Sequence, residues 1–505
     1  MKSAFKTVSF MLVMVLLSKI LGQVREMMIA SIYGGSVQSA AFYAASILPL
    51  NLFDIVFASA VTSSFIPVYN TYLEKSGEAE GDKFASAFIN LVLLCSIVLS
   101  AVLMVFASPF VSVVSYGLTG ETRQLAVSLT IIMMPVMIFA SLAFSFVGIL
   151  QSKGEFNIPA VMSLVLNIAM VLYLCFFNDK FGVTGLSYTL VIGWLLQFLL
   201  QLPAAIKKGF KYQLIFWHKG VKTVFLLALP IMAGTWLQPI TAIINNAFAS
   251  SLDNNLKAIS SLNYANKLYF IVPSVFTMSI TNYIFPRLSK QAVNEDKSEY
   301  VNTLRVAFKI IFLCLIPITA VLVSLRTPII EVVYKRGEFG EEDLYLTAGI
   351  FMYYSLGILF FGLTDLFNKA FYSRKSAIIP AVTAGTAILL NIALSYILKG
   401  KLEVFGLALS SSLTALYISV VLFFFLNKEF KLVGIKDAFD LLKIIAAGVI
   451  LFLASSLLYN YLSFGAGIIG IILKLAVSAG VGGLIYLALI YFFIDDVKGM
   501  VKKIR

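Results

Sequence analysis

Charged residues are scarce in this sequence: they make up 12% of the chain, against about a quarter in a typical soluble protein. Hydrophobic residues, in contrast, make up 60% of its 505 residues. A water-soluble fold could not keep so large an apolar fraction away from solvent. The composition therefore excludes a soluble globular protein and predicts an integral membrane protein.

Residues that commonly carry chemistry are also few, with three cysteines and one histidine. Cys95, Cys175 and Cys314 lie in separate apolar stretches without paired spacing, which favours packing in the core over a disulfide or a metal site. His218 follows Trp217 in a basic loop, as is typical of a membrane interface. We find no nucleotide-binding phosphate loop, zinc-protease pair or nucleophile elbow. We therefore expect no catalytic residues, no metal and no cofactor, and a protein that is not an enzyme.

Long apolar segments recur along the whole chain. A bilayer core about 30 Å thick requires about 20 mostly apolar residues in each spanning helix. The sequence thus predicts an all-α, polytopic membrane protein of about fourteen transmembrane helices. The expected spans are 7–31, 40–70, 84–112, 123–150, 157–178, 183–205, 221–249, 257–286, 301–326, 343–372, 377–398, 403–427, 438–462 and 466–494.

Lysine and arginine are concentrated in alternate loops. The net charge of +13 would suggest nucleic-acid binding in a soluble protein, but here the cations follow the topology of the spans. By the positive-inside rule, the cation-rich loops lie in the cytoplasm. We expect a protein of the cytoplasmic membrane with both termini inside the cell and no nucleic-acid partner. The acidic loop 338–343 is interpreted as a solvated turn rather than a metal site.

The two halves of the chain resemble each other. Three landmarks recur in the same order, about 220 residues apart, which makes chance similarity between proline-ended helices the weaker explanation. An offset of six helices implies parallel repeats with a ligand site between them. We predict an N-terminal lobe, 1–215, a C-terminal lobe, 216–430, and two additional helices with a basic tail, 431–505. The landmarks are Ser64–Pro67 with Tyr283–Pro286, Gly148–Lys153 with Lys369–Lys375, and Asn167 with Asn391.

Several charged and amide side chains fall inside predicted spans, where they are costly and usually functional. Lys19, Gln23 and Glu26 share one face of the first helix, with Arg25 beside it. Converging residues of this kind would form a mainly cationic cavity suited to a phosphate-bearing head group. The alternatives are that Lys19 pairs structurally with Glu26 or Asp54, and that Arg25 and Lys267 snorkel to an interface. The candidate substrate-binding residues are Lys19, Arg25, Glu26, Asn51, Asp54, Asn266 and Lys267.

The motifs resemble those of a known family. Ser18–Glu26 is similar to the signature Ser-Arg-x-x-Gly-x-x-Arg-Asp of the MurJ/MviN family of lipid II flippases, which belongs to the multidrug, oligosaccharidyl-lipid and polysaccharide exporter superfamily. The similarity covers about 1–430. Further matching segments are Ala41–Ala44, Leu48–Pro49, Ser64–Pro67, Asn157–Ala160, Tyr264–Leu268, Phe285–Ser289 and Phe371–Ser373.

The resemblance implies two six-helix lobes, alternating access, and a terminal helix pair that lines a groove for a polyprenyl tail. It also implies that the cavity cations are Lys19, Arg25 and Lys267, of which only Arg25 keeps the family's arginine. Lysine lacks the planar fork that binds phosphate through two hydrogen bonds. This sequence departs from the family's pattern of charged residues at four further positions: Ala40, Phe53, Asp54 and Asn266.

These observations predict a flippase that moves an undecaprenyl-diphosphate-linked cell-wall precursor, lipid II by default, to the outer leaflet for peptidoglycan synthesis. Membrane potential or a cation gradient would drive it. The expected partners are the lipid-linked oligosaccharide, membrane lipids and cell-wall synthesis enzymes, and we expect a monomer. The alternatives are a flippase for another undecaprenyl-linked polysaccharide, a drug or cation antiporter, a membrane glycosyltransferase and a non-transporting scaffold.

Overall fold

The computed structural model describes residues 2–58, 64–465 and 467–494, and every regular element in these segments is a helix. A lipid environment favours this outcome, because a helix pairs its own backbone groups where water is absent. The all-α membrane class is thereby confirmed. The cations of the expected cytoplasmic tail, Lys498, Lys502, Lys503 and Arg505, lie outside the described residues.

The chain forms two compact units, 1–260 and 261–505. The predicted division into lobes at 215 and 430 stays a prediction. The first unit contains α1 (Lys2–Tyr33), α2 (Val37–Phe53), the π-helix η1 (Asp54–Ala58), α3 (Ile66–Ser76), α4 (Glu78–Val105), α5 (Ala107–Val114), α6 (Gly120–Met133), α7 (Val136–Ser152), α8 (Asn157–Phe176), α9 (Asn178–Lys207), α10 (Lys219–Thr235), α11 (Leu237–Ser250) and the start of α12 (Asn255–Tyr269).

The second unit contains the rest of α12 and all later helices. Its elements are η3 (Pro273–Thr277), α13 (Met278–Gln291), α14 (Ser298–Ser324), α15 (Arg326–Tyr334), α16 (Glu341–Leu356), α17 (Ile358–Ser373), α18 (Ile378–Phe430), α19 (Ile435–Tyr461) and α20 (Ile468–Phe493).

The described segments contain nine helices long and apolar enough to cross a bilayer, or ten if the bent pair α16 and α17 forms one span. This number is smaller than the predicted fourteen because several spans are broken into shorter helices, such as α10 and α11. Other neighbouring spans run together. α18 joins two predicted spans across Glu403, whose φ of 49° and ψ of −131° interrupt the helix.

One broken span lies beside the candidate site. α2 contains Pro49 and passes directly into η1, as expected where a proline removes a helical hydrogen bond. The carbonyl of Ile55 in η1 accepts a hydrogen bond from the Trp236 indole, with an N–O distance of 2.9 Å. Trp236 itself separates α10 from α11. This hydrogen bond therefore links the break after α2 to the break between α10 and α11, and it gives a backbone carbonyl of η1 a partner.

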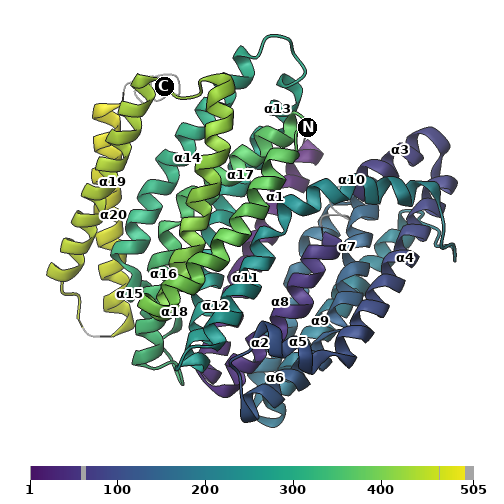
Figure 1. Ribbon diagram of the computed structural model, residues 1–505, viewed down its shortest axis with the longest axis horizontal. Helices are drawn as coiled ribbons and strands as arrows, with labels where there is room; N and C mark the ends of the chain where they lie inside the picture. The colour runs from purple at the N-terminus through teal and green to yellow at the C-terminus, as the bar shows by residue number, and fades with distance from the viewer. Residues whose placement is uncertain (1, 59–63, 466, 495–505) are drawn as a thin grey trace. The chain divides into compact units, whose positions relative to one another are not determined.

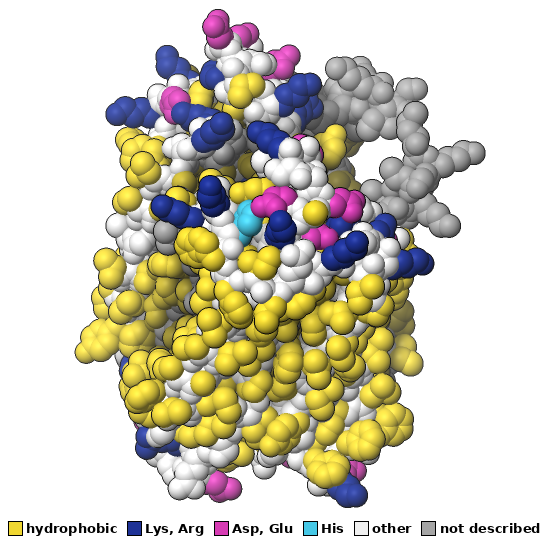
Figure 2. Space-filling model, turned by 90° about the vertical axis from the view of Figure 1, so that its right-hand side faces the viewer, with side chains coloured by type: hydrophobic (Ala, Val, Ile, Leu, Met, Phe, Trp, Pro, Cys, Tyr) yellow, Lys and Arg dark blue, Asp and Glu magenta, His cyan; other side chains and the backbone are white. Residues whose placement is uncertain are grey.

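The outer faces of the helices are apolar. Figure 2 shows a broad band of hydrophobic side chains on one face, with charged side chains above and below it. On α4, Leu94 and Val98 are about half exposed while Phe84 and Phe88 are fully buried. The expectation that all three cysteines pack in the core was wrong for Cys95 and Cys175, which are exposed free thiols. Their helices present these small apolar side chains on the outer surface.

The terminal helices α19 and α20 lie side by side (Figure 1) and pack onto α14 within the second unit. Near the start of α19, the Lys309 ammonium is 2.8 Å from a carboxylate oxygen of Asp437 and 3.6 Å from one of Asp440. On α20, the hydroxyl of Tyr486 donates to the carbonyl of Leu313 at 3.0 Å. Polar contacts therefore fix both helices of the pair to α14.

Candidate functional site

The polar stripe of α1 contains a buried ion pair. Nη2 of Arg25 lies 2.6 Å from Oε1 of Glu26, whose side chain is 5% exposed. The other carboxylate oxygen of Glu26 accepts a hydrogen bond from the Tyr43 hydroxyl on α2 at 2.8 Å. Because burying an unpaired charge is costly, it is significant that both carboxyl oxygens of Glu26 have a partner inside the helix bundle.

Arg25 also links α1 to α8. Its Nη1 donates to Oδ1 of Asn167 at 2.8 Å, and Nδ2 of Asn167 donates to the backbone carbonyl of Ser18 at 3.1 Å. Nε of Arg25 is buried and has no hydrogen-bond partner among the described residues. A guanidinium has five N–H donors, so the protein contacts leave part of its capacity unused.

The remaining candidates in the first unit have different surroundings. Lys19 is exposed one turn before Gln23 on α1. Asn51 donates its side-chain amide to the carbonyl of Ile47 at 2.8 Å, a contact within its own helix. Asp54 is exposed at the first position of η1. Arg25 is one ion-pair partner of Glu26, and a structural pairing of Lys19 with Glu26 or Asp54 stays a prediction.

Asn266 and Lys267 belong to the second unit and are both exposed on α12. Tyr264, three residues before Lys267 on the same helix, is buried. Its ring lies 5.4 Å from that of Tyr334, and the Tyr334 hydroxyl donates to the carbonyl of Tyr264 at 3.1 Å. A meeting of Lys267 with Lys19 and Arg25 stays a prediction.

Two of the positions that depart from the family's pattern of charged residues hold buried apolar side chains. Phe53 is 3% exposed and packs among the rings of Phe144, 5.3 Å away, and Trp194, 6.3 Å away. Ala40 is fully buried. A charged side chain at position 53, as the family's pattern implies, would have to displace this aromatic cluster.

A second ion pair, on α17, was missed by the sequence analysis. Nζ of Lys369 lies 3.1 Å from Oδ2 of Asp365 and 2.8 Å from Oδ1 of Asn282 on α13. The buried Thr281 hydroxyl accepts from Lys369 and donates to Asp365. The available signal was the spacing of an acid and a lysine four residues apart inside an apolar span.

The arrangement of helices has known counterparts among membrane transporters. The fold is similar to an inward-facing multidrug resistance MATE family transporter of the MOP superfamily, with a TM-score of 0.68 and 12% sequence identity. The match covers 84% of this chain and 98% of that one. This likeness shows that the two chains share a fold.

The family follows from the sequence comparison. The family model described as lipid II flippase MurJ matches residues 29–492, and the chain belongs to this family, which is a family of transporters and not an enzyme class. The expected family is confirmed, and the chain is a multi-pass membrane protein.

Individual relatives agree with this assignment over most of their length. The lipid II flippase MurJ of Burkholderia cenocepacia is 28% identical over 425 residues, or 82% of each chain. A probable lipid II flippase MurJ of Buchnera aphidicola is 28% identical over 496 residues, or 95% of each chain. A solved lipid II flippase MurJ in an inward closed conformation is 26% identical, with a TM-score of 0.82, over 96% of this chain and 99% of that one.

Proposed function

We propose that this protein is a flippase that moves lipid II from the inner to the outer leaflet of the cytoplasmic membrane. Membership of the lipid II flippase family supports the substrate. The observation that supports the site is the position of Arg25. This arginine lies inside a membrane-spanning bundle, where it contacts the buried side chains of Asn167 and Glu26. Intramembrane cations of this kind are costly and are usually kept for transport.

In the proposed mechanism, the diphosphate of the substrate competes with Glu26 for Arg25. Arginine binds phosphate oxygens through charge-assisted hydrogen bonds, often two at once. Release from Glu26 would free Nη2 for this purpose. After Glu26 has lost its contact with Arg25, the hydrogen bond from Tyr43 would still hold the Glu26 carboxylate. Binding and release of the head group would therefore exchange one anion for another at the same guanidinium.

The other candidates would complete the site during alternating access. Lys19 and Lys267 would add positive charge, while Asn51, Asp54 and Asn266 would orient the head group. The terminal pair α19 and α20 would shelter the polyprenyl chain. Both termini would lie in the cytoplasm, in keeping with the cation-rich loops. Membrane potential or a cation gradient would supply the energy, because the sequence contains no nucleotide-binding motif.

The proposal also specifies the protein's surroundings. Its partners would be lipid II and the membrane lipids, together with the enzymes that synthesise the cell wall. It would act as a monomer without a cofactor or a catalysed covalent step. Loss of the protein would stop peptidoglycan synthesis and alter cell shape.

The test is complementation of a bacterial strain depleted of its own lipid II flippase, with lipid II measured on each leaflet. The wild-type chain should restore growth and outward lipid II, while Arg25→Ala should restore neither although it inserts normally. Arg123→Ala is the matched control, because exposed Arg123 contacts only the Ser108 and Ser112 hydroxyls among the described residues. Accumulation of a different undecaprenyl-linked glycan with unchanged lipid II would overturn the proposal in favour of a polysaccharide flippase.

A further inference from the structure

The chain between α9 and α10, residues 210–218, is a loop without regular secondary structure that the proposed transport mechanism does not use. It runs beside α4 (Figure 1), where polar side chains spaced four residues apart on one helix face hold it. The backbone N–H groups of Lys211 and Gln213 donate to Oδ2 of Asp82 at 2.9 Å and to the Ser86 hydroxyl at 3.0 Å, and the Asn90 amide donates to the carbonyl of Ile215 at 2.8 Å.

These contacts give the course of the loop along α4. Since an α-helix rises 1.5 Å per residue, the contact at Asn90 lies about 12 Å further along α4 than the contact at Asp82. The chain then returns, because Nε2 of His218 lies 3.2 Å from Oε1 of Glu80. The loop therefore extends toward the middle of α4, is deepest near Ile215, and comes back to the start of the helix.

The deepest part of the loop lies beside the apolar part of α4. The charged residues of this helix are confined to 78–83, and 84–105 contains none. Because α4 is long and apolar enough to cross a bilayer, Asn90 lies on the hydrocarbon side of this boundary. A backbone carbonyl is costly there unless it accepts a hydrogen bond. Asn90 meets this need, because its amide donates to the carbonyls of both Gln213, at 3.1 Å, and Ile215, at 2.8 Å.

The side chains in the deep part of the loop are large, apolar and exposed. Leu214 is 75% exposed, Phe216 52% and Trp217 73%. The hydrogen bonds to α4 hold the backbone of the loop and leave these side chains on the outer surface of the helices. Three adjacent apolar side chains of this size would be unfavourable in water, so the surface they form is suited to contact with lipid.

Lysines lie on both sides of this apolar surface, close to the start of α4. Lys211 is bound there through its backbone at Asp82. Lys219 precedes Gly220, where an added Cβ would come within 2.6 Å of the Phe84 ring. Both lysines are exposed, and neither has an ion pair among the described residues. Two positive charges are therefore available at the level where the charged part of α4 ends.

We propose that this loop binds an anionic phospholipid, with the phosphate on Lys211 and Lys219 and the acyl chains against Leu214, Phe216 and Trp217. The order of these side chains along α4 supports the proposal. The lysines lie at the charged start of the helix and the apolar side chains lie further along it, which is the order of head group and acyl chains in one leaflet. The positive charge favours an anionic lipid over a zwitterionic one.

Native mass spectrometry of the purified full-length protein would compare phosphatidylglycerol with zwitterionic phosphatidylcholine of the same acyl chains. Phosphatidylglycerol should bind more tightly to the wild type. Lys211→Gln combined with Lys219→Gln should weaken its binding about tenfold or more, because each lysine near an anionic head group adds to the affinity. Binding of phosphatidylcholine should not change. Equal affinity of the wild type for the two lipids would overturn the proposal.

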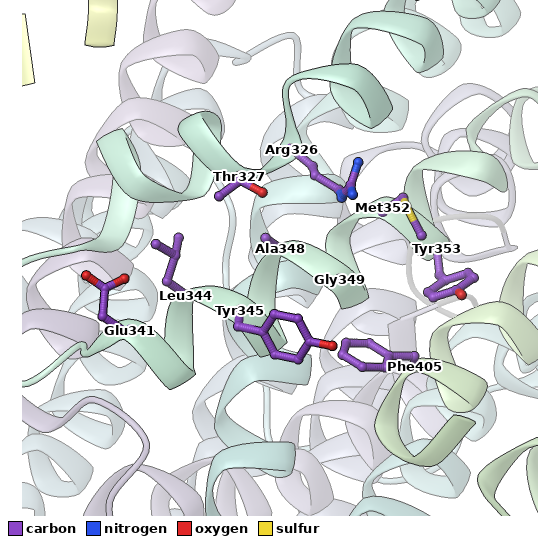
Figure 3. A pocket seen from close by; sticks show the side chains of 10 residues that line it. All are labelled: Arg326, Thr327, Glu341, Leu344, Tyr345, Ala348, Gly349, Met352, Tyr353 and Phe405. Carbon is purple, nitrogen blue, oxygen red and sulfur yellow. The ribbon is translucent and has the colours of Figure 1, made fainter. Parts of the chain in front are cut away.

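Lys290→Gln combined with Arg326→Gln is the matched control, since it also removes two positive charges. Lys290 is exposed on α13. Arg326 lines a pocket of about 420 Å³ in the second unit, where its guanidinium lies beside Met352 (Figure 3), so it is a cation next to an apolar side chain outside the loop. The control should bind phosphatidylglycerol as the wild type does. Equal losses in the two double variants would show that total charge, and not the loop, determines binding.

Trp217 provides an independent test that decides the matter if the lysine variant fails to fold. Phospholipids brominated on their acyl chains quench the fluorescence of a tryptophan that they contact. The chain has three tryptophans, and Trp217→Phe removes only the one in the loop. In vesicles of brominated phosphatidylglycerol, the wild type should lose a larger fraction of its fluorescence than Trp217→Phe. Equal quenching of the two proteins would place Trp217 outside the acyl chains and refute the proposal.

Discussion

Arg25 and Glu26 are adjacent in sequence and form an ion pair, with Nη2 and Oε1 2.6 Å apart, inside the helix that carries the family signature. Adjacent residues on a helix point about 100° apart, so this contact requires both side chains to bend toward each other. Asn167 and Tyr43 hold them there from α8 and α2. The pair is therefore a property of three helices of the first unit together.

Replacing Glu26 with Gln should strengthen the binding of the anionic substrate and slow its transport. The variant removes the negative charge that competes for Arg25 while keeping a hydrogen-bond acceptor for Tyr43. We expect lipid II to bind about tenfold more tightly, in line with a charged hydrogen bond of 1.5–3 kcal/mol, and flipping to slow because release becomes harder. Binding to the purified protein and growth of the depleted strain measure the two effects. Weaker binding by Glu26→Gln would contradict the proposed exchange.

Asn167→Ala should destabilise the first unit. It leaves a donor of Arg25 and the carbonyl of Ser18 without their partner, at a cost of about 1–3 kcal/mol for a buried group. Thermal unfolding in detergent would detect this as a lower Tm. The control is Asn294→Ala, because Asn294 is exposed and its side chain has no hydrogen bond among the described residues. If both variants unfold at the same temperature, Asn167 does not support α1.

Asp365 and Lys369 should depend on each other. Removing one partner leaves the other charge half buried beside Thr281, whereas Asp365→Asn with Lys369→Gln removes both charges. Residues in one ion-pair network typically show coupling of about 0.5–3 kcal/mol. We expect the double variant to be more stable than the sum of the single losses implies. A double-mutant cycle on thermal unfolding measures the coupling, and additive losses would argue against a working ion pair.

Lys19→Arg should be accepted by the transport cycle, since it restores the residue found in the family signature. The planar guanidinium could bind a diphosphate through two hydrogen bonds where an ammonium makes a point contact. We expect a few-fold tighter binding of lipid II, corresponding to about 1 kcal/mol, and normal complementation. The matched variant Lys19→Gln should weaken binding. An inactive Lys19→Arg protein with intact folding would place Lys19 outside the substrate site.

Hydropathy was sufficient to locate the helical segments, because each bilayer crossing needs a long apolar run whatever its neighbours are. It did not locate the breaks within them. Pro49 hinted at one break, but the extent of η1 depends on packing and on the Trp236 contact, which joins residues 181 positions apart. Local sequence carries no information about a partner so distant.

Sequence alone predicted only those features of the candidate site that depend on residues close together in the chain. Charge inside an apolar helix identified Arg25 and Glu26, whose contact is local. Asn167 was noticed as a landmark of the repeat, but its bond to Arg25 spans 142 positions and needs the folded chain. The pair of Asp365 and Lys369 could have been found by its spacing alone. Burial of Phe53 among aromatic rings depends on side chains from three segments and was not predictable.

The anchoring of α19 and α20 constrains how this protein can be shortened or recombined. A chain ending near position 430 would lose Asp437 and Asp440, the carboxylates next to the Lys309 ammonium, and would uncover the side of α14 that Tyr486 now contacts. A terminal pair transplanted from a relative would fit only if it brought an acid to meet Lys309. A substitution of Lys309 on α14 is therefore expected to be tolerated better when Asp437 and Asp440 on α19 change with it.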